Sequence, residues 1–185
     1  INYRANIEAL KMLGVSKVLG VAAVGGIDAG AQPGELALVA DVIDYTWGRA
    51  HTFHDGVEGP LRHIEFAPPY DPAWQAEIQQ ASERAGVRLH QGEIMGVTQG
   101  PRLESAAEVR RLARDGCTLV GMTGMPEAAL AMEAGLAYAS LAVVVNPAAG
   151  TAEGSIHAAI EASLEAGMIQ VRHLLQSLVC NNAVI

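Results

Sequence analysis

Four short segments place small, polar or ionisable residues directly after apolar runs that predict strands. They are VAAVGG at 21–26, TQGPRLE at 98–104, GMTGMPE at 121–127 and VVVNPAAG at 143–150. In an open α/β sheet, ligands bind beyond the carboxyl ends of the strands. The glycines of the first segment would let a backbone approach a ligand closely, although a tight strand-to-loop turn explains them as well. These strand ends are the candidate positions for chemistry.

The side chains in these segments suit anion binding and recognition of a heterocycle. Glu104 is either a ligand's hydrogen-bond acceptor or an acidic residue that the dipole of a following helix favours. Thr123 either binds an anion or caps the helix that Pro126 begins. Asn146 ends a buried strand, where its amide could donate to and accept from a heterocycle, or it takes part in a turn before Pro147. The residue types alone leave each pair of interpretations open.

Metal and cofactor chemistry have no support in the sequence. The six histidines show no H-E-x-x-H or other metal-binding spacing, and no P-loop, G-x-S-x-G or dinucleotide fingerprint occurs. We therefore expect no metal and no cofactor. Cys117 and Cys180 lie far apart and predict reduced thiols in a cytoplasmic protein.

Charge and hydropathy exclude two classes of partner. The net charge is −8, from 12 basic and 20 acidic residues, and no basic cluster appears, which disfavours nucleic acid. No apolar run reaches the roughly 18 residues that a membrane span needs. Half of the 185 residues are apolar, but only 4% are aromatic, which predicts a compact domain built from small side chains.

The elements that must position the four segments alternate along the chain. Helical spacing and capping residues predict helices over 3–13, 72–85, 104–115, 126–134 and 156–178. Apolar runs predict strands over 17–24, 36–43, 87–98, 117–122 and 137–145. This alternation indicates a single α/β domain over residues 1–185 with a largely parallel sheet. Residues 44–70 are predicted to be irregular and to serve a site or an interface.

In this order, the segments resemble purine nucleoside phosphorylases, and within them the branch that acts on 5′-methylthionucleosides. The resemblance covers nearly the whole chain. It implies a three-layer α/β/α domain with a mixed, partly barrel-like sheet, commonly assembled as a homotrimer. The segments that carry the resemblance are INYRANIEALK at 1–11, VAAVGGI at 21–27, QPG at 32–34, TQGPRLESAAE at 98–108 and GMTGMPEAALAMEAGLAYASLAVVVNPAAG at 121–150.

The resemblance implies phosphorolysis, with inorganic phosphate as co-substrate. Phosphate attacks C1′ of the sugar while the purine leaves, through a transition state with cationic character at the sugar. The expected reaction converts S-methyl-5′-thioinosine and phosphate to hypoxanthine and 5-methylthioribose 1-phosphate, in purine and methylthio salvage. Phosphorolysis of inosine or guanosine, and a nucleoside-binding fragment without catalysis, are the alternatives.

The resemblance also assigns roles in phosphate, sugar and purine binding. Ala22 and Ala23 match strand-end positions whose backbone lies by phosphate and ribose. Thr123 matches a hydroxyl residue that binds phosphate. Met122 matches a residue under the ribose, and Leu103 matches the apolar residue that packs on the purine.

Glu104 and Asn146 match the two base-reading positions. Family members that use 6-aminopurines have Asp where this chain has Asn146. An amide can donate to a 6-oxo oxygen and accept from a protonated N7, and a carboxylate can accept from the N1–H that only a 6-oxopurine carries. The pair therefore predicts preference for hypoxanthine-type bases, with Asn146 stabilising the leaving purine at N7.

The pocket for the 5′ group is expected to be apolar. Ile156 and Ile160 lie on one face of the last predicted helix, with His157 between them as either a pocket residue or an exposed one. His63, in the long irregular segment, matches a residue that reaches into the neighbouring subunit's 5′ pocket.

This sequence departs from the family pattern in its phosphate-binding segments. The family has an N-terminal strand with a glycine-rich phosphate loop, then an Arg-His-Gly segment that also binds phosphate. Neither occurs here, and the chain begins at Ile1 rather than Met. We therefore expect this sequence to lack the first strands and about half of the phosphate ligands, either as a fragment of a longer protein or as an inactive truncated one.

Overall fold

The computed structural model describes residues 1–27, 30, 32–56, 60–150 and 156–181, without the side chains of 156–159 and 181. The described helices are α1 (Tyr3–Met12), α2 (Pro72–Ala85), α3 (Ala106–Arg114), α4 (Glu127–Ala134) and α5 (Ile156–Asn181). The strands are β1 (Lys17–Gly26), β2 (Leu36–Asp44), β3 (Leu89–Val97), β4 (Leu119–Gly121) and β5 (Ala137–Pro147). The predicted elements are all present, and no end is shifted by more than three residues.

The strands close into a barrel in the order β1-β4-β3-β2-β5. The pairs β1/β5, β2/β3 and β3/β4 are parallel, whereas β1/β4 and β2/β5 are antiparallel. The prediction of a mixed, partly barrel-like sheet is confirmed. Alternation of strands and helices alone indicated a largely parallel sheet, because it carries no information on the two antiparallel contacts that close the barrel.

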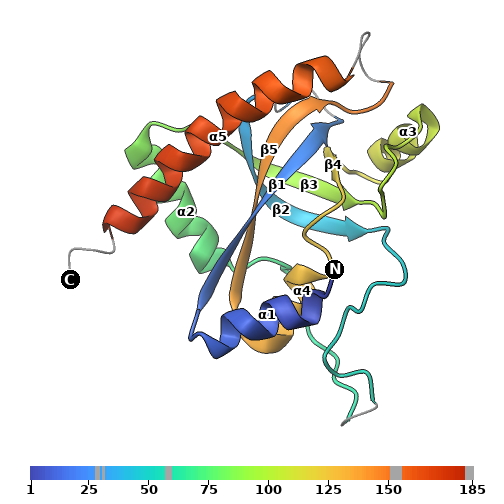
Figure 1. The fold of residues 1–185 in the computed structure, drawn as a ribbon, viewed down its shortest axis with the longest axis vertical. Coiled ribbons are helices and arrows are strands. Elements are labelled where there is room, and N and C mark those ends of the chain that lie inside the picture. The colour runs from blue at the N-terminus through green and yellow to red at the C-terminus, as the bar shows by residue number, and fades with distance from the viewer. Residues whose placement is uncertain (28–29, 31, 57–59, 151–155, 182–185) are drawn as a thin grey trace.

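Helices cover the barrel on two sides, as Figure 1 shows. Strand β5 alternates between two cores, since successive side chains point to opposite faces of a sheet. Its Leu141 and Val143 pack with Ile78 of α2 and Leu174 of α5. Its Ala142 and Val144, with Leu130 of α4 and Ile7 of α1, belong to the other core. These two layers of helices around the sheet confirm the three-layer expectation.

Helix α5 lies very close to β5 because its Gly167 has no side chain. A Cβ at this position would lie 2.3 Å from Cγ1 of Val143. The helix also donates from Nε2 of Gln170 to the Gly34 carbonyl at 2.7 Å. The middle of α5 is therefore held close to β5 and to the chain before β2.

Capping residues decide where the helices begin. Asp71 accepts from the Trp74 N–H at 2.7 Å and Pro72 follows it, so α2 begins where the sequence predicts. Helix α3 begins two residues later than predicted, because Ser105 and Glu108 form a reciprocal capping box. Glu104 thus lies just before the cap, outside the helix.

The segment between β2 and α2 contains no helix or strand among its described residues, as predicted. Of the helices that the structure describes, none combines the length and the apolar character needed to cross a lipid bilayer.

Candidate functional site

A cavity of about 360 Å³ lies where the carboxyl ends of several strands converge. Strands β1 and β5 are parallel and end side by side, and the last two residues of β4, Val120 and Gly121, also line the cavity. Eight of the residues that the sequence predicts for the site line this cavity: Ala22, Ala23, Leu103, Glu104, Met122, Thr123, Asn146 and Ile160.

Two predicted site residues are not placed in this cavity. His63 is exposed and lies in the irregular segment before α2, outside the lining of this chain's own cavity. The side chain of Ile156, like that of His157, lies outside the described part of the structure. Ile160 is the α5 residue that lines the cavity, and it is also packed against the core under α2 and α5.

The glycines at the end of β1 lie within the strand. β1 continues through Gly26, so the turn interpretation of these glycines is wrong. A Cβ on Gly25 would lie 3.3 Å from Cγ1 of Val120 and 3.4 Å from Cα of Ala148. Close contacts with the Val120 side chain and the Ala148 backbone, not a turn, are therefore the physical reason for glycine at position 25.

Asn146 reaches the cavity through an irregularity in the β1/β5 pairing. Val24 pairs with Val144, but Gly25 pairs with Asn146, so β5 carries one extra residue at this point. Such bulges re-aim side chains next to functional sites. Asn146 is only 9% exposed, and its Nδ2 donates to the Pro147 carbonyl at 2.6 Å. One amide proton and the amide oxygen remain for a ligand.

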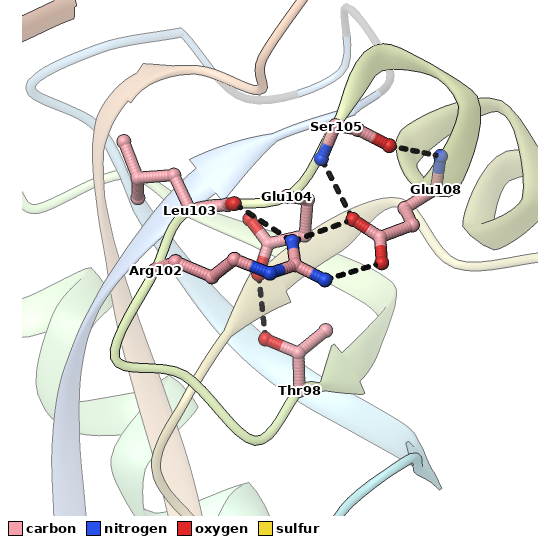
Figure 2. A network of polar contacts seen from close by, with 6 residues as sticks. All are labelled: Thr98, Arg102, Leu103, Glu104, Ser105 and Glu108. Carbon is pink, nitrogen blue, oxygen red and sulfur yellow. Dashed lines mark hydrogen bonds and ion pairs between the residues drawn. The ribbon is translucent and has the colours of Figure 1, made fainter.

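Glu104 is held by Thr98. The Thr98 hydroxyl donates to Oε1 of Glu104 at 2.6 Å (Figure 2). The acidic residue of the first turn of α3 is Glu108, so the helix-dipole interpretation of Glu104 is wrong. Glu104 is half-buried at the wall of the cavity, where its carboxylate can accept from a ligand.

The loop that carries Glu104 is closed by an ion pair. Both terminal nitrogens of Arg102 contact the Glu108 carboxylate at 2.8 Å, and Glu108 also accepts from the Ser105 N–H at 2.8 Å. The Arg102 guanidinium, followed by the Ser105 N–H, lowers the pKa of Glu108 to about 2. Arg102 is therefore engaged in a structural pair on the surface.

Thr123 is exposed and does not cap α4. The N-cap of α4 is Pro126, which makes no side-chain capping bond. Among the residues that the structure describes, the Thr123 hydroxyl makes no hydrogen bond, so it is available to a ligand in the cavity. The capping interpretation of Thr123 is wrong, because the helix begins four residues later.

Apolar side chains form two further parts of the wall. Leu103 lines the cavity and is 46% exposed. Met122 packs against Gly100, where a Cβ would lie 2.5 Å from its sulfur.

No lysine, arginine or histidine lines this cavity among the described residues. An anion bound there would be held by backbone N–H groups and the Thr123 hydroxyl.

Arg49 organises the loops around the cavity, and the sequence did not single it out. Its guanidinium donates to the carbonyl oxygens of Thr98, Gln99 and Met122 at 3.1–3.3 Å, and also to that of Met125. The same group lies 5.5 Å from the centre of the Tyr3 ring. No motif marks a lone arginine in an irregular segment, so only its contacts reveal this role.

The chain is similar in sequence to curated nucleoside phosphorylases. A probable S-methyl-5′-thioinosine phosphorylase of Xylella fastidiosa (strain 9a5c) is 52% identical over 155 residues, which are 84% of this chain and 65% of that relative. A probable 6-oxopurine nucleoside phosphorylase of Moorella thermoacetica is 44% identical over 81% of this chain and 58% of its own length. The chain thus spans less than two thirds of the length of these relatives.

A solved structure extends the match to the fold. Methylthioadenosine phosphorylase from Schistosoma mansoni in complex with adenine has a TM-score of 0.91 and 27% identity, and the match covers 100% of this chain and 72% of that one. The model of the Phosphorylase superfamily matches residues 1–179. The chain belongs to the phosphorylase superfamily.

Proposed function

We propose that this protein catalyses the phosphorolysis of S-methyl-5′-thioinosine to hypoxanthine and 5-methylthioribose 1-phosphate. The observation that carries the proposal is that Glu104 and Asn146 line one cavity together with Leu103, Met122 and Ile160. The relatives from Xylella and Xanthomonas that are 51–52% identical bear the name of this activity.

The two polar residues support a 6-oxopurine. The Glu104 carboxylate accepts from N1–H, while Asn146 donates to the 6-oxo oxygen and accepts from N7–H. Adenine would present its N1 lone pair to a carboxylate, and a buried mismatch of this kind discriminates by several powers of ten. Asn146 also stabilises the purine as it gains negative charge on leaving.

The remaining lining residues support the sugar and phosphate roles. Thr123 and the backbone of Ala22 and Ala23 bind the phosphate that attacks C1′. Met122 lies under the ribose and Leu103 packs on the purine. Ile160 offers an apolar surface that favours a methylthio group over a hydroxyl.

A second candidate function is phosphorolysis of inosine or guanosine. It is favoured by the relatives named 6-oxopurine nucleoside phosphorylase, at 36–44% identity. Both candidates act on a 6-oxopurine nucleoside, and inosine differs from S-methyl-5′-thioinosine only in the 5′ group. Nucleoside binding without phosphorolysis is the third possibility, and release of a sugar 1-phosphate would exclude it.

Steady-state kinetics test the proposal directly. We expect kcat/KM for S-methyl-5′-thioinosine to exceed that for methylthioadenosine by at least about 100-fold, because one polar mismatch in a buried site has this effect. A higher value for methylthioadenosine would overturn the base assignment. Equal or better turnover of inosine would favour the second candidate.

We also propose that the protein works as a homotrimer in the cytoplasm. The family resemblance supports the trimer, and the two free cysteines, Cys117 and Cys180, agree with a reducing compartment. In such a trimer, the exposed His63 would reach the 5′ pocket of a neighbouring copy.

A further inference from the structure

We infer that Thr98 is a positioning residue that makes Glu104 selective for 6-oxopurines. The inference rests on the proposed function, since it explains how the base-reading carboxylate keeps its orientation. It starts from the hydrogen bond between the Thr98 hydroxyl and Oε1 of Glu104, which is 2.6 Å long.

The backbone of Thr98 is fixed by the barrel. Thr98 follows β3 directly, and its N–H donates to the Gly121 carbonyl at 2.8 Å, which continues the pairing of β3 with β4. Its hydroxyl has one proton and two acceptors in reach, Oε1 of Glu104 at 2.6 Å and the Gly121 oxygen at 3.4 Å. The shorter contact to a charged acceptor takes the proton, because charge-assisted hydrogen bonds are the stronger ones.

The main chain on the other side of Glu104 is also held. Arg102 bonds to Glu108 and to the Leu103 carbonyl, and Glu108 bonds to the Ser105 N–H (Figure 2). The residues before and after Glu104 are thereby tied together. The freedom that remains is rotation of the Glu104 side chain, which the hydrogen bond from the Thr98 hydroxyl restricts.

Two cavities meet at Glu104. It lines the candidate cavity and also a second cavity of about 380 Å³ that contains Tyr45, Trp47 and Thr98. Thr98 lines only the second cavity. Its hydroxyl therefore bonds Oε1 from the side of the second cavity, which leaves Oε2 to accept from a purine in the candidate cavity.

Selectivity follows from this orientation. An acceptor held towards the purine is satisfied by N1–H of a 6-oxopurine and left unpaired by N1 of a 6-aminopurine. A carboxylate that rotates freely can turn away from the unmatched base, which lowers the penalty for adenine. Loss of the Thr98 hydroxyl should therefore reduce discrimination more than it reduces turnover of the better substrate.

The test compares Thr98→Val and Thr98→Ala with Thr98→Ser, which keeps the hydroxyl. We expect the ratio of kcat/KM for methylthioinosine to that for methylthioadenosine to fall about tenfold in the first two, and to stay within about twofold in the third. The binding ratio of free hypoxanthine to free adenine, measured by calorimetry, should change in parallel. Because Thr98 borders a cavity, either apolar substitute has room.

Thr118→Val is the matched control. Thr118 also uses its hydroxyl to hold β3, accepting from the Ile94 N–H at 2.9 Å, but it does not line the candidate cavity. It should lower stability and leave both ratios unchanged. Wild-type ratios retained by Thr98→Val and Thr98→Ala would overturn the inference alone. A wild-type protein that does not prefer the 6-oxopurine would overturn the proposed function and this inference together.

Discussion

At the scale of single residues, Asn146 and Glu104 both line the cavity, but their side chains are fixed to different degrees. Asn146 is buried, and its side chain is bonded to the neighbouring Pro147 carbonyl. Glu104 is half-buried and depends on Thr98 for its orientation. Burial makes a mismatch at Asn146 costly, because water cannot replace a lost hydrogen bond there. Asn146 is therefore the position where one substitution should change base preference most.

Asn146→Asp should move activity towards 6-aminopurines. A carboxylate accepts from an exocyclic amino group but cannot donate to a 6-oxo oxygen. We expect the ratio of kcat/KM for methylthioinosine to that for methylthioadenosine to fall by about 100-fold, measured by initial rates.

Asn2→Asp controls for the added charge, since Asn2 caps α1 by accepting from the Ala5 N–H and lies outside the cavity. Aspartate is as good a cap, so this variant should keep the wild-type ratio. An unchanged ratio in Asn146→Asp would remove Asn146 from base recognition.

At the scale of elements, the start of α3 controls the loop that carries Glu104. The capping box and the Arg102–Glu108 pair join the loop to the first turn of the helix. Both depend on an ionised Glu108, whose pKa Arg102 and the Ser105 N–H lower from 4.5 to about 2. This end of α3 is therefore the acid-sensitive part of the site's framework.

Lowering the pH should destabilise the folded protein, because Glu108 becomes protonated. The pKa of Glu108 is lower in the folded protein than in the unfolded chain, so between pH 4.5 and about 2 the unfolded chain binds more protons. Its stabilising effect is complete above pH 4.5 and is lost as the pH falls towards 2. We expect urea midpoints to decrease over this window in the wild type and to decrease less in Glu108→Gln.

Arg102→Gln provides the matched comparison, because the Arg102 guanidinium is the main cause of the lowered pKa. In Arg102→Gln, the urea midpoint should also decrease less than in the wild type between pH 4.5 and about 2. If both variants keep the wild-type acid dependence, Glu108 does not govern stability in this range.

At the scale of the whole molecule, the barrel brings together the strand ends that form the cavity. The antiparallel contact of β1 with β4 places Gly25 beside Val120, so β4 lies next to the ends of the parallel pair β1 and β5. One apolar residue of the wall, Ile160, comes from α5, which Gly167 allows close to β5. His63 is exposed and does not line this cavity, so its proposed role needs a second copy of the chain.

A homotrimer with shared sites should show complementation between two defective variants. We expect His63→Ala to impair turnover of methylthio substrates and Asn146→Ala to impair catalysis. Co-assembled subunits of the two variants should regain activity, because some sites then combine an intact Asn146 with an intact His63 from a neighbour. Sedimentation velocity should show a trimer. A monomer, or mixed assemblies without recovery, would contradict the proposal.

Much of the fold could be predicted because its signals are local. Apolar runs, Pro72 with Gly86, and Pro126 with Gly135 mark where strands and helices begin and end. Local patterns could not show that β1 pairs antiparallel with β4, since strand direction across a barrel depends on the three-dimensional path of the chain. For the same reason, the sequence could not show whether Gly25 is needed for a turn or for a close contact.

The sequence by itself determined which residue types stand at the strand ends, and with them the chemistry of Glu104, Thr123 and Asn146. Only the tertiary structure decided that Thr98 supports Glu104 and that Arg49 ties the loops around the cavity. Arg49 lies 49 residues before Thr98 and 73 before Met122. Contacts over such separations form when the barrel closes, and no local periodicity or spacing records them.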